Sequence, residues 1–219
     1  MKPNINTQEY WDHRFSSGDW EDRRGRWQTE SFARAQIPHL GIARDFAGTI
    51  VDFGCGLGDA IPVYREFFPK AILTGVDISG EAIKQCRQKY GRTASFAQGD
   101  YLAVPEADII IASNVFEHLP NDRLIARHLI SRCSSLYIIV PYRERPLDPE
   151  HINRYGRDYF HEIGGYDWRV FTCPGWSQYG RRLIIDVYLK NIGRLFLGRP
   201  IRRRGKQILF RFRQAEWKK

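Results

Sequence analysis

Apolar and polar positions divide the chain into segments of different texture. Residues 1–45 are mostly polar with scattered aromatic side chains, and we expect them to be helical, including a helix from Gln28 towards His39. From Thr49 onward, short apolar runs alternate with amphipathic stretches. Runs of this length predict buried strands, and strands that alternate with helices predict a doubly wound parallel sheet with helices on both faces. The predicted fold class is therefore α/β.

The apolar runs and the turn residues between them give the expected boundaries. Strands are predicted at 49–53, 71–77, 94–100, 107–114 and 134–141, and helices at 60–68, 79–90 and 122–132. Ser79 is a suitable N-cap because its hydroxyl can accept a bond from the first turn of its helix. The long polar loop after Pro141 has the position of a functional loop. Two further strands, 168–173 and 182–189, are predicted to form an antiparallel hairpin at the sheet edge.

The net charge of +9 is concentrated at the C-terminal end of the chain. Residues 190–219 contain eleven basic residues and one acidic residue, which leaves residues 1–189 close to neutral. The high pI is therefore no sign of a nucleic-acid-binding fold. Aromatic residues make up 14% of the chain, which excludes disorder of the whole sequence.

The N-terminal sequence, the lengths of the apolar runs and the spacing of the cysteines indicate the expected cellular compartment. No apolar run approaches the ~20 residues of a bilayer span, and the polar N-terminus is unlike a secretory signal. The four cysteines form no CxxC pair and no zinc-like spacing with histidine. We therefore expect free thiols, a cytoplasmic location and no metal.

A glycine-rich loop follows the first predicted strand. Gly54, Gly56 and Gly58 have the spacing G-x-G-x-G, which allows a sharp turn and the close approach of a ligand. A dinucleotide-binding loop needs its third glycine at position 59, where this chain has Asp59. An acidic residue facing a pyrophosphate would repel it, so NAD and FAD are disfavoured.

Carboxylates stand at the ends of three successive predicted strands. Asp52 and Asp77 end the first and second strands, and Asp100 ends the third, with Tyr101 next to it. A carboxylate at the second position can accept bonds from ribose hydroxyls. A carboxylate and an aromatic ring at the third can hold an adenine by its amino group and its face. Together with the glycine loop, these residues predict a nucleoside-containing ligand.

These segments resemble the class I S-adenosylmethionine-dependent methyltransferases of the small-molecule type. The resemblance rests on VDFGCGLGD, TGVDIS, AQGDYL, IIIASNVFEHLP and YIIVP, in the order and spacing of that family. It implies a Rossmann-like, seven-stranded sheet whose last strand is antiparallel, with S-adenosylmethionine as methyl donor and S-adenosylhomocysteine as product. The cofactor-binding residues that it implies are Asp52, Gly54, Cys55 (through its backbone), Gly56, Asp77, Ile78, Asp100, Tyr101 and Asn114.

Within this resemblance, Asp52, Gly54, Gly56 and Asn114 lie beside the methionine part of the cofactor. Asp77 binds the ribose hydroxyls, and Asp100 and Tyr101 bind the adenine.

Two histidines are candidates for a base that takes a proton from the acceptor. His151 is favoured because the segment after strand five borders the acceptor site in related enzymes, and His118 lies in a family motif that commonly shapes the cofactor pocket. Tyr142 and Glu150 are weaker candidates in the same region, and His161 is expected to be structural.

The N-terminal segment is a candidate lid, since methyl transfer benefits from a closed, dry pocket. Trp11, Arg14, Trp27 and Gln28 are its candidate substrate-facing residues. The alternative is a helix that uses its tryptophans as core. The expected organisation is a helical cap at 1–45, a catalytic domain at 46–190 and a basic tail at 191–219.

The tail mixes basic and apolar residues and has candidate partners of its own. It contains Arg202, Arg203 and Arg204 and the alternation Phe-Arg-Phe-Arg at 210–213. Such a segment can associate with an anionic membrane surface, and less favourably with nucleic acid. A terminus that is solvated, or that packs on its own domain, is the alternative. Membrane binding would place the protein at the inner membrane surface.

The expected activity is O-methylation of a small molecule or of a sugar or lipid-linked glycan. Enzymes that methylate the amino groups of nucleic-acid bases usually carry an Asn/Asp-Pro-Pro-aromatic segment after strand four, where this chain has residues 113–116, Ser-Asn-Val-Phe. The alternatives are an RNA or protein methyltransferase that docks through the tail, and a non-catalytic binding module with a methyltransferase-like fold.

Overall fold

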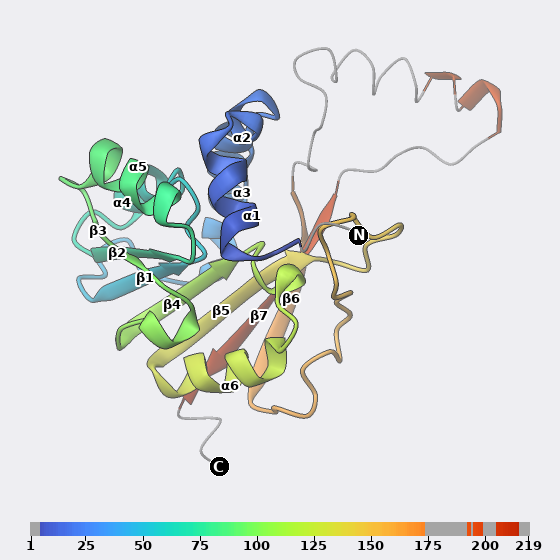
Figure 1. The fold of residues 1–219 in the computed structure, drawn as a ribbon. Helices are drawn as coiled ribbons and strands as arrows, with labels where there is room; N and C mark the ends of the chain where they lie inside the picture. Colours follow the sequence, from blue (N-terminus) through green and yellow to red (C-terminus); the bar gives the residue numbers. More distant parts are fainter. Residues whose placement is uncertain (1–4, 174–191, 194, 199–204, 215–219) are drawn as a thin grey trace.

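A seven-stranded mixed sheet forms the centre of the part of the chain described by the computed structural model, residues 5–173, 192–193, 195–198 and 205–214 (Figure 1). The strands are β1 (Thr49–Phe53), β2 (Ile72–Asp77), β3 (Ser95–Gln98), β4 (Ala107–Ser113), β5 (Cys133–Pro141), β6 (Tyr166–Thr172) and β7 (Lys206–Arg213). Their order is β3-β2-β1-β4-β5-β7-β6. The first five pair in parallel, and β7 is antiparallel to both of its neighbours.

Helices cover both faces of this sheet, and three of them precede it. They are α1 (Gln8–Ser16), α2 (Asp19–Asp22), α3 (Gly25–Leu40), α4 (Ile61–Phe67), α5 (Gly80–Tyr90) and α6 (Asp122–Ser131), with short 3-10 turns at Tyr101–Ala103 and Phe116–His118. The alternation along the chain confirms the predicted α/β fold with an antiparallel last strand. None of the helices in the described ranges combines the length and apolar character of a membrane span.

Alternate residues of the central strands supply two separate cores. On β4, Ile109 and Ile111 pack with α3, α4 and α5 on one face, whereas Ile110 and Ala112 pack with α6 on the other. Figure 1 shows α4 and α5 on the opposite side of the sheet from α6. Because successive side chains of a strand point to opposite faces, a strand buried on both sides appears in sequence as a continuous apolar run.

The local signals used for prediction agree with the structure in the parallel half of the sheet. Ser79 is the N-cap of α5, and its Oγ accepts a hydrogen bond from the backbone amide of Ala82 at 3.1 Å. Each predicted parallel strand overlaps the observed one, with boundaries that differ by at most two residues.

The last strand is not where the sequence pattern placed it. β6 pairs with β7, with Tyr166 opposite Phe212, instead of with the predicted strand at 182–189, which lies outside the described residues. The predicted basic tail at 191–219 is therefore wrong over 206–213. That stretch is an inner strand between β5 and β6.

The Phe-Arg alternation at 210–213 belongs to a buried strand and is not a membrane-binding surface. Phe210 and Phe212 are fully buried against Tyr155, Phe160 and Tyr166. The arginines between and after them point to the other face, where both contact the carboxylate of Asp167, at 2.6 and 3.1 Å. Period-two alternation is the signature of a strand, and these phenylalanines are not free to insert into a membrane. The arginines at 202–204 lie outside the described residues.

Replacing Phe210 with alanine tests whether the C-terminal segment belongs to the core. We expect Phe210→Ala to lower the free energy of unfolding by about 3–5 kcal/mol, because it removes a fully buried ring from between the sheet and Phe160. The matched control is Phe196→Ala, because that ring is 88% exposed. The control should change stability by less than about 0.5 kcal/mol. Equal effects of the two changes in urea unfolding would contradict the assignment of β7.

Candidate active site

A cavity of about 880 Å³ opens at the carboxyl ends of all five parallel strands. This edge of a doubly wound sheet is the usual place for a ligand. The strands and the loops after them contribute these residues to its wall: Asp52, Phe53, Gly54, Cys55, Gly56, Asp77, Ile78, Gly99, Asp100, Tyr101, Ser113, Asn114, Val115, Pro141 and Tyr142. All nine predicted cofactor residues therefore line one cavity.

The glycine loop turns because all three of its glycines adopt positive φ angles. Gly54 has φ 74° and Gly56 has φ 51°, in the left-handed region that favours glycine. A side chain at Gly54 would also collide with Val115, 2.2 Å from the position of a Cβ atom. The amides of Gly54 and Cys55 donate to the carbonyl of Val76, at 2.7 and 3.1 Å. These bonds hold the loop against β2 and leave its cavity side open.

Asp77 fastens the glycine loop to the beginning of α5. One oxygen of its carboxylate accepts a hydrogen bond from the amide of Gly56 at 2.7 Å, and the other accepts from the amide of Ser79 at 2.9 Å. Burial raises the pKa of Asp77 above its usual value, although the two backbone bonds act in the opposite direction. The carboxylate that was predicted to meet a ribose therefore also organises the loop.

Asp52 is a buried carboxylate that lacks a hydrogen-bond partner among the described residues. It is 4% exposed and lines the cavity beside Asp77. Burial and the negative charge of Asp77 raise the pKa of Asp52 to about 7. Two neighbouring buried carboxylates without a cation cost free energy, which a positively charged ligand group would recover. The methionine part of S-adenosylmethionine carries an ammonium and a sulfonium, so this end of the cavity fits that cofactor.

The other end of the predicted cofactor site is more open. Ile78 is 37% exposed on the cavity wall. Asp100 uses one carboxylate oxygen to cap the turn that follows β3, by accepting from the amide of Leu102 at 2.9 Å. Tyr101, next to it, also lines the cavity. An apolar wall with a carboxylate and an aromatic ring has the composition expected for an adenine site.

An amide network that the sequence pattern did not reveal positions Asn114. The Oδ1 atom of Asn114 accepts a hydrogen bond from Gln207 on β7 at 2.8 Å, and Gln36 on α3 donates to Gln207 at 3.0 Å. Gln36 and Gln207 are both buried. Because these residues are far apart in sequence, no local signal could have identified them as neighbours of the site.

Asp59 does not face the cavity, so the prediction that it would repel a pyrophosphate there is wrong. Asp59 is 1% exposed and does not line the cavity, and its carboxylate accepts a hydrogen bond from the hydroxyl of Tyr90 at 2.9 Å. The side chain points towards α5, so it would not face a pyrophosphate.

The acceptor-side candidates meet at a second region of the cavity, where two histidine rings lie edge to face. The ring centroids of His118 and His151 are 4.9 Å apart. The Nδ1–H group of His118 donates to the backbone carbonyl of Glu150 at 3.1 Å, and that of His151 donates to the carboxylate of Glu144 at 2.5 Å. In both rings Nε2 has no hydrogen-bond partner within the described part of the chain. Glu117 lies beside them and was not predicted as a site residue.

Burial and charge set opposite protonation tendencies in this histidine cluster. Burial, reinforced by nearby His151, lowers the pKa of His118 to about 3. Burial also lowers the pKa of His151, but the bond to Glu144 and the charge of Glu117 outweigh it, and the net shift is upward. Burial raises the pKa of Glu117 to about 7. His118 therefore stays neutral, while His151 is the ring that can hold a proton.

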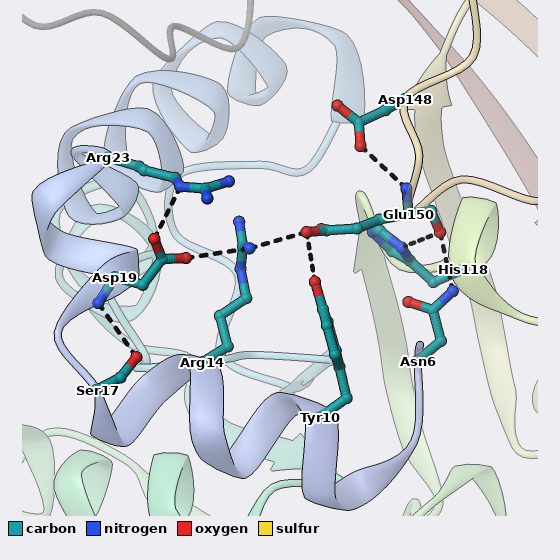
Figure 2. A network of polar contacts seen from close by, with 9 residues as sticks. All are labelled: Asn6, Tyr10, Arg14, Ser17, Asp19, Arg23, His118, Asp148 and Glu150. Carbon is teal, nitrogen blue, oxygen red and sulfur yellow. Dashed lines mark hydrogen bonds and ion pairs between the residues drawn. The ribbon is translucent and has the colours of Figure 1, made fainter. Parts of the chain in front are cut away.

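The N-terminal helix α1 covers this region through the carboxylate of Glu150, as Figure 2 shows. That carboxylate accepts a hydrogen bond from the hydroxyl of Tyr10 at 2.6 Å and pairs with Arg14 at 2.8 Å. Arg14, which is 7% exposed, also contacts Asp19 at 3.1 Å. The backbone carbonyl of Glu150 accepts from Asn6 and from His118. Glu150, predicted as a weak candidate base, instead lies at the centre of this network.

A second contact holds the opposite side of α1. Asp12 accepts hydrogen bonds from the hydroxyl of Ser79 at 2.6 Å and from the amide of Glu81 at 3.1 Å, at the N-terminus of α5. A carboxylate is favourable at that position because it meets unpaired amides and the positive end of the helix dipole. α1 therefore bridges α5 and the loop after β5.

The structure separates the candidate lid residues into two groups. Trp11 and Arg14 line the cavity, whereas Trp27 and Gln28 do not. Tyr142, the weaker candidate base, also lines it. On α3 the cavity-facing residues are Thr29, Phe32 and Ala33, which share one face of the helix, and Trp27 is 49% exposed elsewhere. His161 also lies outside the cavity wall, with Nδ1 donating to the carbonyl of Asp158 at 2.9 Å.

Comparison with known proteins connects this geometry to methyl transfer. Residues 50–134 match a family model described as "Methyltransferase domain". A trans-aconitate 2-methyltransferase of Azoarcus sp. (strain BH72) is 31% identical over 115 residues, which are 51% of this chain and 45% of the relative. One of Rhodopseudomonas palustris (strain BisB5) is 28% identical over 137 residues, 61% of this chain and 50% of the relative. The chain thus matches about half the length of these curated relatives.

Solved structures show the same fold at low identity. The plantazolicin methyltransferase BpumL in complex with SAH superimposes with a TM-score of 0.60 at 16% identity, covering 94% of this chain and 95% of that one. Coclaurine N-methyltransferase, bound to N-methylheliamine and SAH, superimposes with a TM-score of 0.58 at 14% identity, covering 83% and 71%. These likenesses establish the fold.

The stability of Asp52 variants should depend on pH with a defined sign. Burial raises the pKa of Asp52 from its usual 3.8 to about 7 in the folded chain, so the native chain loses stability as pH rises between these values, by up to about 4 kcal/mol. The Asp52→Asn variant has no ionisable group at this position, so its stability does not fall in this way as pH rises. We therefore expect the advantage of the variant, measured by urea unfolding without ligand, to grow from about pH 5 to about pH 8.

The matched control for this measurement is Asp108→Asn. Hydrogen bonds from Thr49 lower the pKa of Asp108, so its contribution is lost only in acid and is constant across this range. A difference between Asp52→Asn and the native chain that is independent of pH would show that Asp52 is ionised in the folded protein.

Weakening the Glu150 network should release α1. Glu150→Gln removes the charge that pairs with buried Arg14, a loss of about 1.5–3 kcal/mol for a hydrogen bond to a charged group. We expect hydrogen exchange of the amides of residues 8–16 to accelerate ~10-fold or more. The control is Glu9→Gln, an exposed change on the same helix. Equal protection in both variants would mean that α1 is held without Glu150.

Proposed function

We propose, from the premise that this chain carries a class I S-adenosylmethionine-dependent methyltransferase domain, that the protein methylates an oxygen atom of a small-molecule acceptor. The single observation that carries the proposal is one cavity that joins the buried carboxylates Asp52 and Asp77 to the histidine cluster under α1. The first region fits the methyl donor, and the second offers a proton acceptor where the acceptor molecule would lie.

The size of the cavity favours a small acceptor. Sites for small molecules and cofactors have volumes of about 300–1,000 Å³, and this one of about 880 Å³ must hold donor and acceptor together. Helix α1 lies beside the carboxyl ends of the strands (Figure 1), and its residues Trp11, Arg14 and Phe15 line the cavity. A folded RNA or protein would have to enter by one flexible side chain or nucleotide. The similarity to enzymes named for trans-aconitate makes small carboxylic acids a natural starting class, beside the hydroxyls of sugars and lipid-linked glycans.

The chain's own residues account for binding and orientation at the donor end. S-adenosylmethionine supplies an activated methyl group, so the protein has mainly to align the acceptor and to exclude water. Asp52 and Asp77 would hold the positively charged methionine end and the ribose. The glycine loop allows close approach, and Asn114 has its amide oriented by Gln207. Asp100, Tyr101 and Ile78 would hold the adenine.

His151 is the proposed proton acceptor for a hydroxyl substrate. Its Nδ1–H bond to Glu144 leaves Nε2 as the basic nitrogen on the cavity side. The two carboxylates Glu144 and Glu117 stabilise the protonated ring. A base of this kind contributes ~10²–10⁴-fold to a rate, and a carboxylate acceptor would not need it. His118 is a weaker candidate for the base, because burial keeps its ring neutral. Its proposed role is to form part of the cavity wall.

We further propose that α1, which is part of the helical cap at 1–45, serves as a lid over the cavity. Its two contacts, through Asp12 to α5 and through Arg14 and Tyr10 to Glu150, bridge the donor and acceptor sides. Opening of α1 would admit both molecules, and closing would remove water from around the reacting atoms. Trp11, whose ring lies 5.2 Å from that of His118, would cover the acceptor.

Titration calorimetry with S-adenosylhomocysteine tests the donor half of the proposal. We expect micromolar binding to the native chain that Asp77→Asn weakens ~10-fold or more, which corresponds to about 1.4 kcal/mol. Asp108→Asn should bind as the native chain does, because Asp108 lies outside the cavity wall. Absence of S-adenosylhomocysteine binding by folded protein would overturn the proposed function and leave a methyltransferase-like scaffold.

A further inference from the structure

The cluster of Glu117, His118 and His151 has the composition of a metal site. Each of these residues offers one ligand atom, and the three atoms lie within 4.8 Å of one another. Two imidazoles and one carboxylate are a common ligand set for zinc and for other first-row divalent ions. The sequence pattern did not predict it, because His151 is 33 residues beyond His118 and no short spacing connects them.

The hydrogen bonds of the two histidines prepare both rings for coordination. Metal-bound histidine almost always donates its other ring N–H to a carboxylate or a backbone carbonyl. His118 donates from Nδ1 to the carbonyl of Glu150, and His151 donates from Nδ1 to Glu144. Both bonds leave Nε2 unprotonated in the neutral ring. The two nitrogens that remain are therefore lone-pair donors.

Glu117 supplies an independent observation that points to a missing ligand. Its side chain is 1% exposed, and its Oε2 atom has no hydrogen-bond partner among the described residues. Leaving such an atom unpaired costs about 1–3 kcal/mol or more for a charged group. It also lines the cavity. An ion shared with the two histidines would satisfy it.

The geometry allows an ion after a modest contraction. Bonds of about 2.0–2.2 Å from a tetrahedral ion place ligand atoms about 3.4 Å apart. The observed limit of 4.8 Å is wider, so the side chains would have to close by about 1.4 Å. Side-chain rotation can supply this, since His151 is only partly buried and the space between the three groups is cavity.

We propose that Glu117, His118 and His151 bind a divalent first-row transition ion, with zinc the best match, whose open coordination position faces the acceptor. The metal site itself does not depend on the proposed function. Only the assignment of an acceptor oxygen as the fourth ligand rests on that function. Methyl donation itself needs no metal. With the ion bound, Nε2 of His151 is a ligand instead of a base. The ion lowers the pKa of the bound hydroxyl, whose proton leaves to water before the oxygen receives the methyl group. Acceptors with a hydroxyl that can occupy this one position would then be favoured.

Calorimetric titration of the full chain, stripped of metal, with ZnCl₂ is the first test. We expect one zinc ion per chain, and no comparable heat from MgCl₂. His151→Gln and Glu117→Gln should each weaken zinc binding ~100-fold or more, and Glu144→Gln should weaken it ~10–100-fold because it only orients His151. His161→Gln is the matched control, an exposed histidine outside the cavity, and should bind zinc as the native chain does.

Cobalt substitution separates this site from the four buried cysteines. Co²⁺ in a site of two histidines and one carboxylate gives ligand-field bands without thiolate charge transfer, and both variants that remove a ligand should abolish them. A thiolate signature, or zinc binding that survives both His151→Gln and Glu117→Gln in folded protein, overturns the site, as does no binding at all. S-adenosylhomocysteine titrated into the same samples reports on the donor site separately, so loss of one with retention of the other identifies which proposal fails.

Discussion

Two buried carboxylates at the carboxyl ends of β1 and β2, Asp52 and Asp77, are the constraint around which the proposed donor end of the cavity is arranged. Asp77 accepts backbone bonds from the glycine loop and from the start of α5, and so determines the position of both. Asp52 beside it has no hydrogen-bond partner among the described residues and a pKa raised by burial and by Asp77. The folded chain therefore tolerates an unfavourable charge arrangement at the position where a cationic ligand would relieve it. Strain of this kind is expected at a functional site and is otherwise selected against.

The proposed acceptor end depends on a different carboxylate, that of Glu150, and helix α1 connects the two ends. Glu150 binds Tyr10 and Arg14 of α1 through its side chain, and its backbone carbonyl orients His118. Through Asp12 the same helix contacts the N-terminus of α5, which Asp77 also holds. A change in the position of α1 would therefore be felt at both ends. This coupling gives a physical reason why closure of the cap and assembly of the site would occur together.

Local patterns were sufficient to predict the parallel half of the sheet, and the residues predicted to bind the cofactor lie together on one cavity wall. The apolar runs of β1 to β5, the N-cap at Ser79 and the glycine loop are determined by residues close together in sequence, and all were predicted near their observed positions. The sequence pattern misplaces the last strand, because β7 combines the period-two pattern of a strand with the charge of a basic tail. Trp27 and Gln28 lie off the cavity wall because packing decides which face of α3 turns towards the cavity.

Periodicity and short motifs, which act over a few residues, were enough to predict the fold class, the parallel strands and the edge of the sheet where a ligand would bind. Three features emerge only once the chain is folded. Lys206–Arg213 lies inside the sheet, Gln36 and Gln207 orient Asn114, and Glu117, His118 and His151 converge. These are contacts between segments far apart along the chain, and their partners are chosen by how the two cores pack, for which a single sequence carries no local signal.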